Sequence, residues 1–224
     1  MEALEQIKAR VEAAVPAAKI EIVQNASPSQ QHSLMIDNEH ARDVAKWLRD
    51  DPALRLDFCS DVTGVDWLDR TLKKTIKVKK VVDGEEKEVT ETTEEKIPGY
   101  IEAVYHLYSM THKHGPVIIR MRTPDRGENS RLPSLMPIWR SAEFQEREIF
   151  DLYGVKFDGH PDLRRILMWD EFEDYPMRKD YREPDDYEYE PTPHDDVVEK
   201  AKRYYASRPQ SDGAEGIVEG AKPA

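Results

Sequence analysis

The chain is poor in the residues and motifs that hold cofactors, and each shortage excludes a class of protein. Its 224 residues include one cysteine, Cys59, which cannot form an internal disulfide. A single thiolate also cannot ligate an iron–sulfur cluster, which takes about four. The sequence contains neither a GxGxxG loop nor a P-loop, so it shows no nucleotide-binding fingerprint. We therefore expect the chain itself to carry no cofactor.

Long apolar runs and a surplus of basic residues are missing as well. No run approaches the roughly 18 apolar residues that span a bilayer, and the N-terminus lacks the apolar core of a signal peptide. With 45 acidic against 33 basic side chains, the formal net charge is -12. Nucleic acid is disfavoured as a partner because phosphates need a basic surface. We expect a protein that stays in the cytoplasm, has no direct membrane span and suits basic protein partners.

A predicted helix over residues 142–153 organises the chain. Ser141 suits its N-cap, and Gly154 stands where a left-handed C-terminal cap belongs. Apolar residues lie near one face of this helix, namely Ala142, Ile149 and Tyr153. Charged residues of alternating sign follow one another at i, i+4 spacing, namely Glu143, Arg147 and Asp151. This polar side is suited to pairing with itself or with a partner.

Two turns and a run of paired charges follow this helix. Residues 158–159, Asp-Gly, are a turn signal, and the proline after His160 suits the first position of a new helical turn. Residues 164–165 are two arginines that precede an apolar run. Residues 178–180, Arg-Lys-Asp, close the stretch with a second group of charges.

These residues resemble the signature of the 30 kDa subunit family of respiratory complex I, the NADH:quinone oxidoreductase. The matching positions are Glu146-Arg147-Glu148, Asp151-Leu152-Tyr153, His160, Arg164 and Ile166-Leu167. Residues 176–181, PMRKDY, resemble the family's Pro-Leu-Arg-Lys-Asp-Phe ending, and residues 104–107, VYHL, resemble its central strand. The family's usual Trp-Gly pair is replaced here by residues 171–175, EFEDY.

The resemblance implies a cofactor-free structural subunit in the quinone module of the peripheral arm. FMN and iron–sulfur clusters would lie in partner subunits and carry electrons from NADH to quinone, coupled to proton translocation. The partners would be other peripheral-arm subunits, chiefly the large 49 kDa-type subunit, on the cytoplasmic side of the inner membrane. The charged signature residues would form the subunit interface: Glu146, Arg147, Glu148, Asp151, His160, Arg164, Arg165, Arg178, Lys179 and Asp180.

Two alternatives stay open. Membrane-bound hydrogenases and ferredoxin- or F420-linked dehydrogenases carry similar subunits, so the resemblance leaves the electron donor undetermined. A freestanding hydrolase is the alternative from another class, and its acid–base groups would be Glu146, Glu148, Asp151 and His160. We favour ion pairing for these residues, because arginines match the carboxylates in number along the stretch. A deep pocket lined by the carboxylates would favour the hydrolase.

The N-terminal half alternates helix and strand patterns. Residues 2–14 predict a helix that ends before Pro16, and short strand patterns at 19–24 and 33–36 predict a hairpin. A second helix is capped by Asp37 or Asn38 and continues to Arg49. Its apolar residues form one buried stripe, namely Ala41, Val44, Ala45 and Leu48.

Residues 54–59 predict a strand, and the Asp/Gly-rich residues 61–67 that follow predict a turn that packs Trp67 against the sheet. A site loop is the functional alternative for this turn. The composition then shifts abruptly from lysines to glutamates across residues 69–96. With residues 83–84, Asp-Gly, as its turn, this segment predicts a hairpin insertion. The expected cross-strand pairs are Lys73 with Glu94, Val78 with Val89, Lys79 with Glu88 and, as one mismatch, Lys80 with Lys87.

Residues 100–110 and 116–122 are the best strand patterns, and a polar tip separates them. His112 and His114 at this tip lack a third metal ligand at fixed spacing, so we expect polar turn residues rather than a metal site. His106 lies inside the first of these strands, and we expect a hydrogen-bonded structural histidine rather than a catalytic one.

We predict an α+β fold, with a mostly antiparallel sheet and helices on one face. Its strands lie at about Ile20, Leu34, Leu56, Val104 and Ile118, in an order that the pattern leaves open. The domain spans residues 1–153, with the hairpin insertion at about 69–98. Residues 154–191 hold the signature turns and an extended partner-binding arm, and residues 192–224 a short helix and a disordered tail.

Overall fold

The computed structural model describes the backbone of residues 2–82, 85–170 and 172–182, and side chains within them apart from 73–93. The predicted arm beyond Arg182 and the helix expected within 192–224 lie outside the described residues. In chain order the elements are α1 (Leu4–Ala14), β1 (Ile20–Val23), β2 (Ser33–Ile36), α2 (Ala41–Asp50), β3 (Phe58–Trp67), β4 (Arg70–Val82), β5 (Glu85–Ile97), β6 (Tyr100–Ser109), β7 (His114–Arg122), β8 (Arg131–Pro133), α3 (Ala142–Tyr153) and β9 (Lys156–Asp158).

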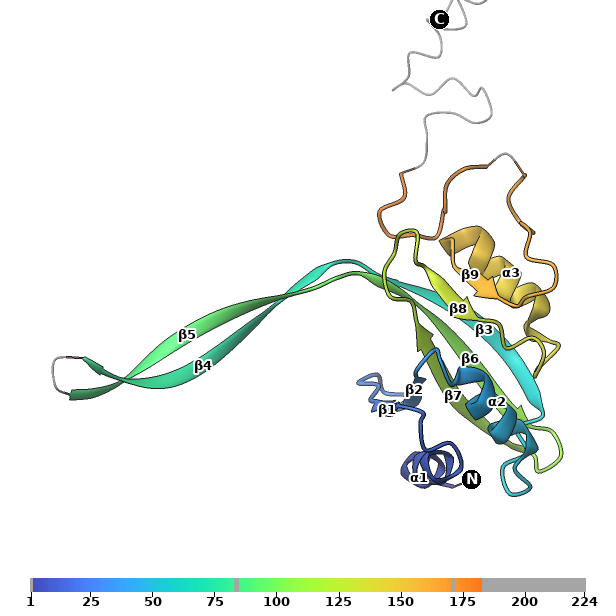
Figure 1. Cartoon of the computed structure of the whole chain (residues 1–224), viewed down its shortest axis with the longest axis horizontal. Coiled ribbons are helices and arrows are strands. Elements are labelled where there is room, and N and C mark those ends of the chain that lie inside the picture. Colours follow the sequence, from blue (N-terminus) through green and yellow to red (C-terminus); the bar gives the residue numbers. More distant parts are fainter. Residues whose placement is uncertain (1, 83–84, 171, 183–224) are drawn as a thin grey trace, which may run out of the picture. The chain divides into compact units, whose positions relative to one another are not determined.

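A five-stranded sheet in the order β1-β2-β7-β6-β3 forms the centre of the domain (Figure 1). Its strand pairs are antiparallel except for β2 with β7, which run parallel because the chain crosses over between them. The α+β fold with a mostly antiparallel sheet is therefore confirmed.

One hydrophobic core joins the three helices to the sheet. The predicted stripe of α2 from Ala41 to Leu48 is fully buried, and it meets Ile7 of α1 and Ile149 of α3 in the same cluster. The sheet contributes side chains such as Tyr105, which is also fully buried. The helices thus pack on one face of the sheet, as the amphipathic patterns predict.

Strand β3 lies further along the chain than predicted. Leu54 and Leu56 are buried but precede the strand, and residues 61–67, expected to form a turn, pair with β6 instead. The turn interpretation was wrong because buried and exposed positions alternate through this segment, which is the period of a strand. Gly64 is needed there, since a Cβ atom would lie 2.6 Å from the ring of Tyr153.

The charged insertion is a two-stranded ribbon of β4 and β5, outside the five-stranded sheet (Figure 1). Its register is the one that a turn at residues 83–84 predicts. The Cα partners are Lys73 with Glu94, Val78 with Val89, Lys79 with Glu88 and Lys80 with Lys87.

The histidines of the β6–β7 hairpin divide into two groups. His112 and His114 stack their rings at 6.0 Å, and His112 Nε2 lies 3.0 Å from the carbonyl of Pro52, as suits a polar turn. His106 departs from the expectation of a hydrogen-bonded ring. Its Nδ1 is buried without a hydrogen-bond partner in the described part of the chain, 3.7 Å from the Asp61 carboxylate.

The chain after α3 stays on the domain. Strand β9 pairs in parallel with β8, and the described residues up to Tyr181 form one compact unit. The helical turn expected after His160 is absent, and residues 160–170 lack regular secondary structure.

Candidate subunit-interface segment

Glu146 projects from α3 into the core, where it is fully buried. Its carboxylate accepts hydrogen bonds from the Ser134 hydroxyl at 2.6 Å, the Leu135 N–H at 2.8 Å and the Tyr105 hydroxyl at 3.0 Å. Burial raises the pKa of Glu146 above its usual value, and these three donors oppose the rise. Glu146 therefore joins α3 to β6 and to the segment after β8.

Asp151, also fully buried, holds the chain that follows β9. One carboxylate oxygen accepts the backbone N–H groups of Ile166, Leu167 and Met168 at 3.0, 2.7 and 2.9 Å. The other accepts a hydrogen bond from Arg165 at 2.7 Å. Burial opposes the charge, yet the backbone donors and Arg165 together lower the pKa of Asp151. This carboxylate fixes the fold of an otherwise irregular loop.

Arg147, one turn before Asp151 on α3, contacts the same loop. Its guanidinium donates to the carbonyls of Arg164 and Arg165, both at 3.1 Å, and lies 5.6 Å from the ring centre of Phe144. The side chain is only 6% exposed, and the nearest carboxylate oxygen, from Asp162, is 3.9 Å away. Arg147 thus acts mainly as a donor to the backbone.

The other charges of this part of the signature lie nearer the surface. His160 Nε2 lies 3.0 Å from the Glu143 carbonyl, while the exposed Arg164 pairs with Asp162 at 3.0 Å. Glu148 is exposed to solvent. The pairing along the helix suggested by the i, i+4 spacing does not form, because Arg147 and Asp151 turn to the following loop.

The Arg-Lys-Asp group at residues 178–180 holds the end of this segment on the domain. Arg178 donates to the Tyr153 carbonyl at 2.7 Å and lies 4.6 Å from the Tyr175 ring centre. Burial, and then the charge of Arg126, lowers the pKa of Arg178. Asp180 pairs with Arg126 at 2.6 Å.

Asp66 and Arg126 are two residues of this site that sequence patterns missed. Arg126 binds both carboxylate oxygens of the buried Asp66, at 2.7 and 2.8 Å, and Asp66 also accepts the Lys179 N–H at 2.9 Å. The two residues are separated by 60 positions, and Asp66 lay in a segment predicted as a turn. No local signal marks such a pair.

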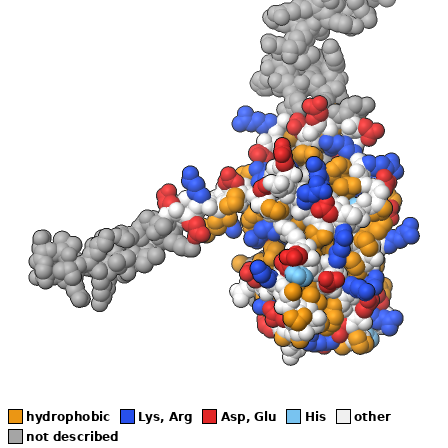
Figure 2. Space-filling model, viewed as in Figure 1, with side chains coloured by type: hydrophobic (Ala, Val, Ile, Leu, Met, Phe, Trp, Pro, Cys, Tyr) orange, Lys and Arg blue, Asp and Glu red, His pale blue; other side chains and the backbone are white. Residues whose placement is uncertain are grey.

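With the charges directed inward, apolar side chains face the solvent along α3 and its loops. Phe144 is 58% exposed, Leu167 62% and Met177 53%, and Ile166 lies beside Leu167. Figure 2 shows hydrophobic side chains between acidic and basic ones on one face of the molecule. Exposed large apolar side chains such as the adjacent Ile166 and Leu167 are candidates for a protein interface. We call Phe144, Ile166, Leu167 and Met177 the signature patch.

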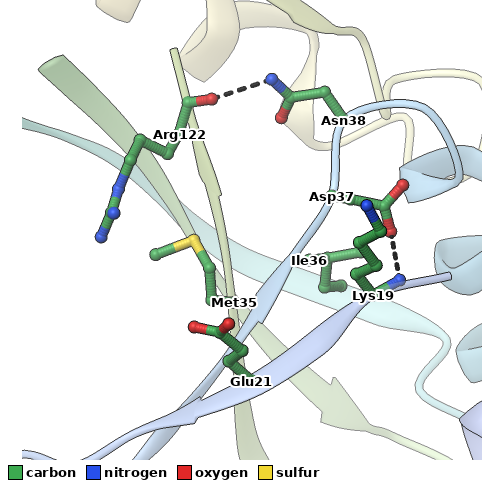
Figure 3. Close-up of a pocket in the computed structure, with 7 residues that line it drawn as sticks. All are labelled: Lys19, Glu21, Met35, Ile36, Asp37, Asn38 and Arg122. Atoms are coloured by element: carbon green, nitrogen blue, oxygen red, sulfur yellow. Dashed lines mark hydrogen bonds between the residues drawn. The ribbon is translucent and has the colours of Figure 1, made fainter. Parts of the chain in front are cut away.

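Three open depressions elsewhere on the described surface do not involve the signature carboxylates. Figure 3 shows one of them, between Lys19 and Arg122. Some of its polar groups have partners: the backbone N–H of Lys19 donates to Asp37 at 2.7 Å, and Arg122 pairs with Glu102 at 3.0 Å. The buried Oδ1 of Asn38 has no hydrogen-bond partner in the described part of the chain. None of the signature residues lines this depression.

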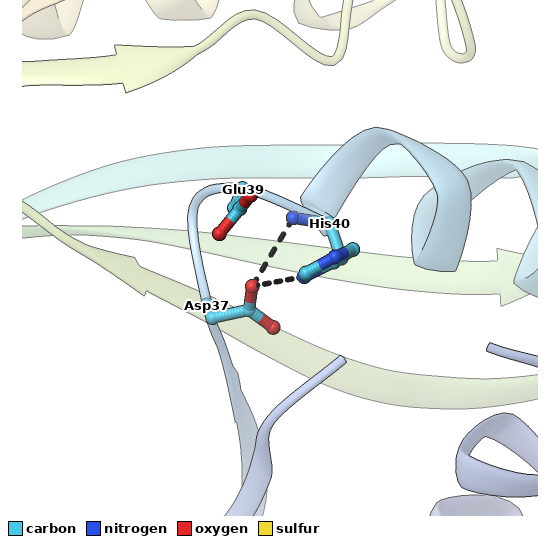
Figure 4. Close-up of side chains that lie close together, drawn as sticks. All are labelled: Asp37, Glu39 and His40. Atoms are coloured by element: carbon cyan, nitrogen blue, oxygen red, sulfur yellow. Dashed lines mark hydrogen bonds and ion pairs between the residues drawn. The ribbon is translucent and has the colours of Figure 1, made fainter. Parts of the chain in front are cut away.

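Asp37, Glu39 and His40 are the one group of possible metal ligands among the described residues (Figure 4). Asp37 accepts the His40 N–H at 3.2 Å, and its carboxylate lies 2.6 Å from His40 Nδ1. The group stands before the first turn of α2, where the helix dipole disfavours a cation. We interpret it as the start of that helix rather than as a metal site.

Comparison with known proteins decides the family. The description "Respiratory-chain NADH dehydrogenase, 30 Kd subunit" matches residues 34–187, well over half of the chain. The chain belongs to this 30 kDa subunit family. The resemblance predicted from the signature is therefore confirmed, and the whole candidate segment lies within the matched residues.

Relatives in the family are 35–38% identical to this chain over the aligned residues. The C subunit of the NADH-quinone oxidoreductase of Coxiella burnetii is 38% identical over 146 residues, which cover 63% of each chain. Its counterpart from Saccharopolyspora erythraea is 35% identical over 65% of this chain and 47% of its own length. The chain thus spans about half to two thirds of the length of these relatives.

A solved structure supports the fold alone. A chain of the membrane-bound sulfane sulfur reductase, an archaeal respiratory membrane complex, is 19% identical with a TM-score of 0.52. The match covers 96% of this chain and 98% of that one. In the described part of this family member, no helix has the length and apolar character to cross a bilayer.

Proposed function

We propose that the chain is a cofactor-free structural subunit of the peripheral arm of a proton-translocating NADH:quinone oxidoreductase. Electrons pass from NADH through FMN and iron–sulfur clusters to quinone in partner subunits, and this chain helps to hold those subunits together. The observation that carries the proposal is that the buried signature charges bind backbone and side-chain groups of their own chain. Arg147 and Asp151 fix the loop at residues 164–168, and this loop presents Ile166 and Leu167 of the signature patch to solvent.

The proposed partner at this patch is the large 49 kDa-type subunit of the quinone module. Burying large apolar side chains stabilises an interface by roughly 1.5–3 kcal/mol for each one fully covered. A loop with many ordered backbone hydrogen bonds loses little entropy on binding, so more of that energy remains as affinity. This role places the chain at the cytoplasmic side of the inner membrane, peripheral and held through the complex.

Cys59 supports the proposal that the chain holds no cluster or reactive thiol. Its side chain is fully buried, and burial raises the pKa of the thiol to about 12. A neutral, enclosed thiol is neither a metal ligand nor a nucleophile at neutral pH.

Hydrolysis by the signature carboxylates is not supported by their surroundings. Glu146 and Asp151 are fully buried, and each already accepts three or more hydrogen bonds. A general acid or base must reach a substrate within hydrogen-bond distance. The scaffold role does not depend on the electron donor, since hydrogenase-like and ferredoxin- or F420-linked complexes would use the same scaffold.

Capture of the tagged chain at its native expression level tests the proposal. We expect the large quinone-module subunit and its neighbours to copurify with it. Leu167→Ser should lower that recovery at least about tenfold, because about 1.4 kcal/mol of lost affinity is tenfold in binding. Met110→Ser is the matched control, since Met110 is 64% exposed in the β6–β7 turn, away from the patch. Capture of no respiratory subunit by the wild-type chain would contradict the proposal.

A further inference from the structure

Trp67, the last residue of β3, has a ring that is fixed by its own chain. It pairs with Tyr100, the first residue of β6, and the two ring centres lie 6.2 Å apart. The indole N–H donates to the buried Glu102 carboxylate at 3.0 Å. Because its polar group is bonded and its neighbours belong to the sheet, the half-buried ring is a preorganised surface.

Three cations lie against these two rings. Arg70 is 5.7 Å and Lys179 5.4 Å from the ring centre of Trp67, and Arg122 is 3.9 Å from that of Tyr100. All three distances are within the roughly 6 Å over which an aromatic face attracts a cation. Arg70 and Lys179 are exposed, and the side chain of Arg122 is 45% exposed. Positive charge is therefore gathered at one place on the surface.

The carboxylates near these cations all accept hydrogen bonds from their own chain, namely Asp66, Asp69, Glu102 and Asp180. Glu102 binds two arginines, Arg120 at 3.2 Å and Arg122 at 3.0 Å. Arg70 and Lys179 form no salt bridge within the part of the chain that the structure describes. With Arg120 and Arg126 included, cations outnumber carboxylates around Trp67, in a chain whose net charge is -12. The excess lies on Arg70 and Lys179.

An exposed apolar side chain adjoins the cations. Leu68, which follows Trp67 in the chain, is 42% exposed. Tryptophan and arginine are enriched in protein interfaces, where they lie among apolar side chains. We call Trp67, Leu68, Arg70, Arg122 and Lys179 the Trp67 patch. It shares no residue with the signature patch.

Charge decides which kind of partner suits the Trp67 patch. A membrane of anionic lipid or a nucleic acid presents extended negative charge, which repels a chain of net charge -12. A short acidic segment of a protein meets the local excess of positive charge alone. The guanidinium of Arg70 can form two parallel hydrogen bonds with one carboxylate, and the ammonium of Lys179 can bind another. Charge complementarity therefore points to Asp or Glu side chains of a neighbouring protein.

We propose that the Trp67 patch binds an acidic segment of a neighbouring subunit, with Arg70 and Lys179 each bonded to a carboxylate of that segment. The proposal rests on the proposed function, because it takes the neighbour from the same respiratory complex. Trp67 and Leu68 exclude water from the two ion pairs, which strengthens them. The contact differs in chemistry from the apolar one at the signature patch.

Zero-length cross-linking of the assembled wild-type complex tests the contact directly. A carbodiimide joins a lysine amine to a carboxylate as an amide, with loss of water, where the two groups touch. We expect an amide between Lys179 and an Asp or Glu of another subunit, identified by mass spectrometry of the digested complex. An assembled complex in which Lys179 forms no amide with another subunit overturns the proposal.

Two matched double variants in the full chain measure what the charges contribute. Arg70→Gln with Lys179→Gln removes both cations and keeps the Lys179 N–H that Asp66 accepts. Lys46→Gln with Arg55→Gln makes the same change in net charge at exposed positions on α2 and before β3. We expect the first variant to lower the complex recovered on a native gel at least about tenfold. The second should leave recovery within about twofold of wild type.

Each other outcome contradicts a defined statement. Normal recovery with the variant of the Trp67 patch overturns this proposal alone, and so does equal loss with both variants. Binding of purified wild type to vesicles of anionic phospholipid, abolished by the patch variant, identifies a membrane surface and overturns it too. Wild type that enters no respiratory complex overturns the proposed function and this proposal with it. If the patch variant does not fold, the cross-link in the wild-type complex decides.

Discussion

Arg126 binds the buried carboxylate of Asp66 through two parallel hydrogen bonds, at 2.7 and 2.8 Å. The same guanidinium binds Asp180 at 2.6 and 3.0 Å, and Asp66 accepts the Lys179 N–H at 2.9 Å. This pair joins the end of β3, the loop after β7 and the last residues of the described segment. The direction of the chain at Tyr181 is therefore set by a contact between residues far apart in sequence.

Arg126→Ala should destabilise the purified chain by about 3 kcal/mol, because it leaves the Asp66 carboxylate buried and without its cation. Urea unfolding measures this change. Arg131→Ala is the control: the pair of Arg131 with Asp158 is about half exposed on both sides, so its loss should change the free energy of unfolding far less. Equal effects of the two substitutions would show that the Asp66 contact is no stronger than a surface pair.

Asp151→Asn should lower stability at neutral pH by about 3 kcal/mol, since the charged acceptor of several hydrogen bonds is lost. The folded-state pKa of Asp151 lies below its usual value, so the carboxyl group binds fewer protons in the folded chain than in the unfolded chain. Its contribution is therefore complete above about pH 4 and decreases as pH falls through the folded pKa. Urea unfolding from pH 7 to pH 3 should show the difference from wild type shrinking. A difference that stays constant with pH would contradict the assignment.

Arg147→Ala or Arg178→Ala should lower the amount of assembled complex, because each removes the support of a segment that carries the signature patch. The turnover of each surviving complex should change little. Quinone reductase activity divided by the complex recovered on a native gel measures both effects. Full assembly with activity reduced about a hundredfold or more, as on losing a catalytic acid or base, would assign these residues to the chemistry.

Replacing residues 73–93 by a short turn should leave the domain folded, since β4 and β5 pair only with each other among the described strands and long surface insertions are thermodynamically mild. Thermal unfolding should stay cooperative, with a midpoint close to that of wild type. Loss of the cooperative transition would show that the ribbon belongs to the folding unit.

The purified chain should be colourless and should bind neither flavin nor NADH. Only Cys59 offers a thiolate, its pKa is about 12, and the sequence contains no nucleotide-binding loop. Absorption spectra and titration with FMN and NADH measure this. A stoichiometric flavin or iron–sulfur spectrum from pure protein would contradict the prediction.

Local sequence was sufficient where neighbours within a few residues decide the structure. The bounds of α3 follow from helix-forming residues before Gly154, whose φ of 77° is the left-handed cap that glycine suits. The register of the ribbon follows from a two-residue turn, which fixes every pair behind it. Strand β3 was misplaced because its Asp and Gly residues are typical of turns, while pairing with β6 decides their conformation.

The sequence by itself determined the family, the helix that carries the signature and the hairpin insertion. Only the tertiary structure decided the role of each signature charge. The signature predicted Glu146 and Asp151 at a subunit interface. Both are fully buried inside the chain, because donors from β6, the segment after β8 and the loop at 165–168 converge on them. Asp66 meets Arg126 and Lys179 only when three distant segments pack together. Such burial depends on long-range packing, which spacing along the chain does not encode.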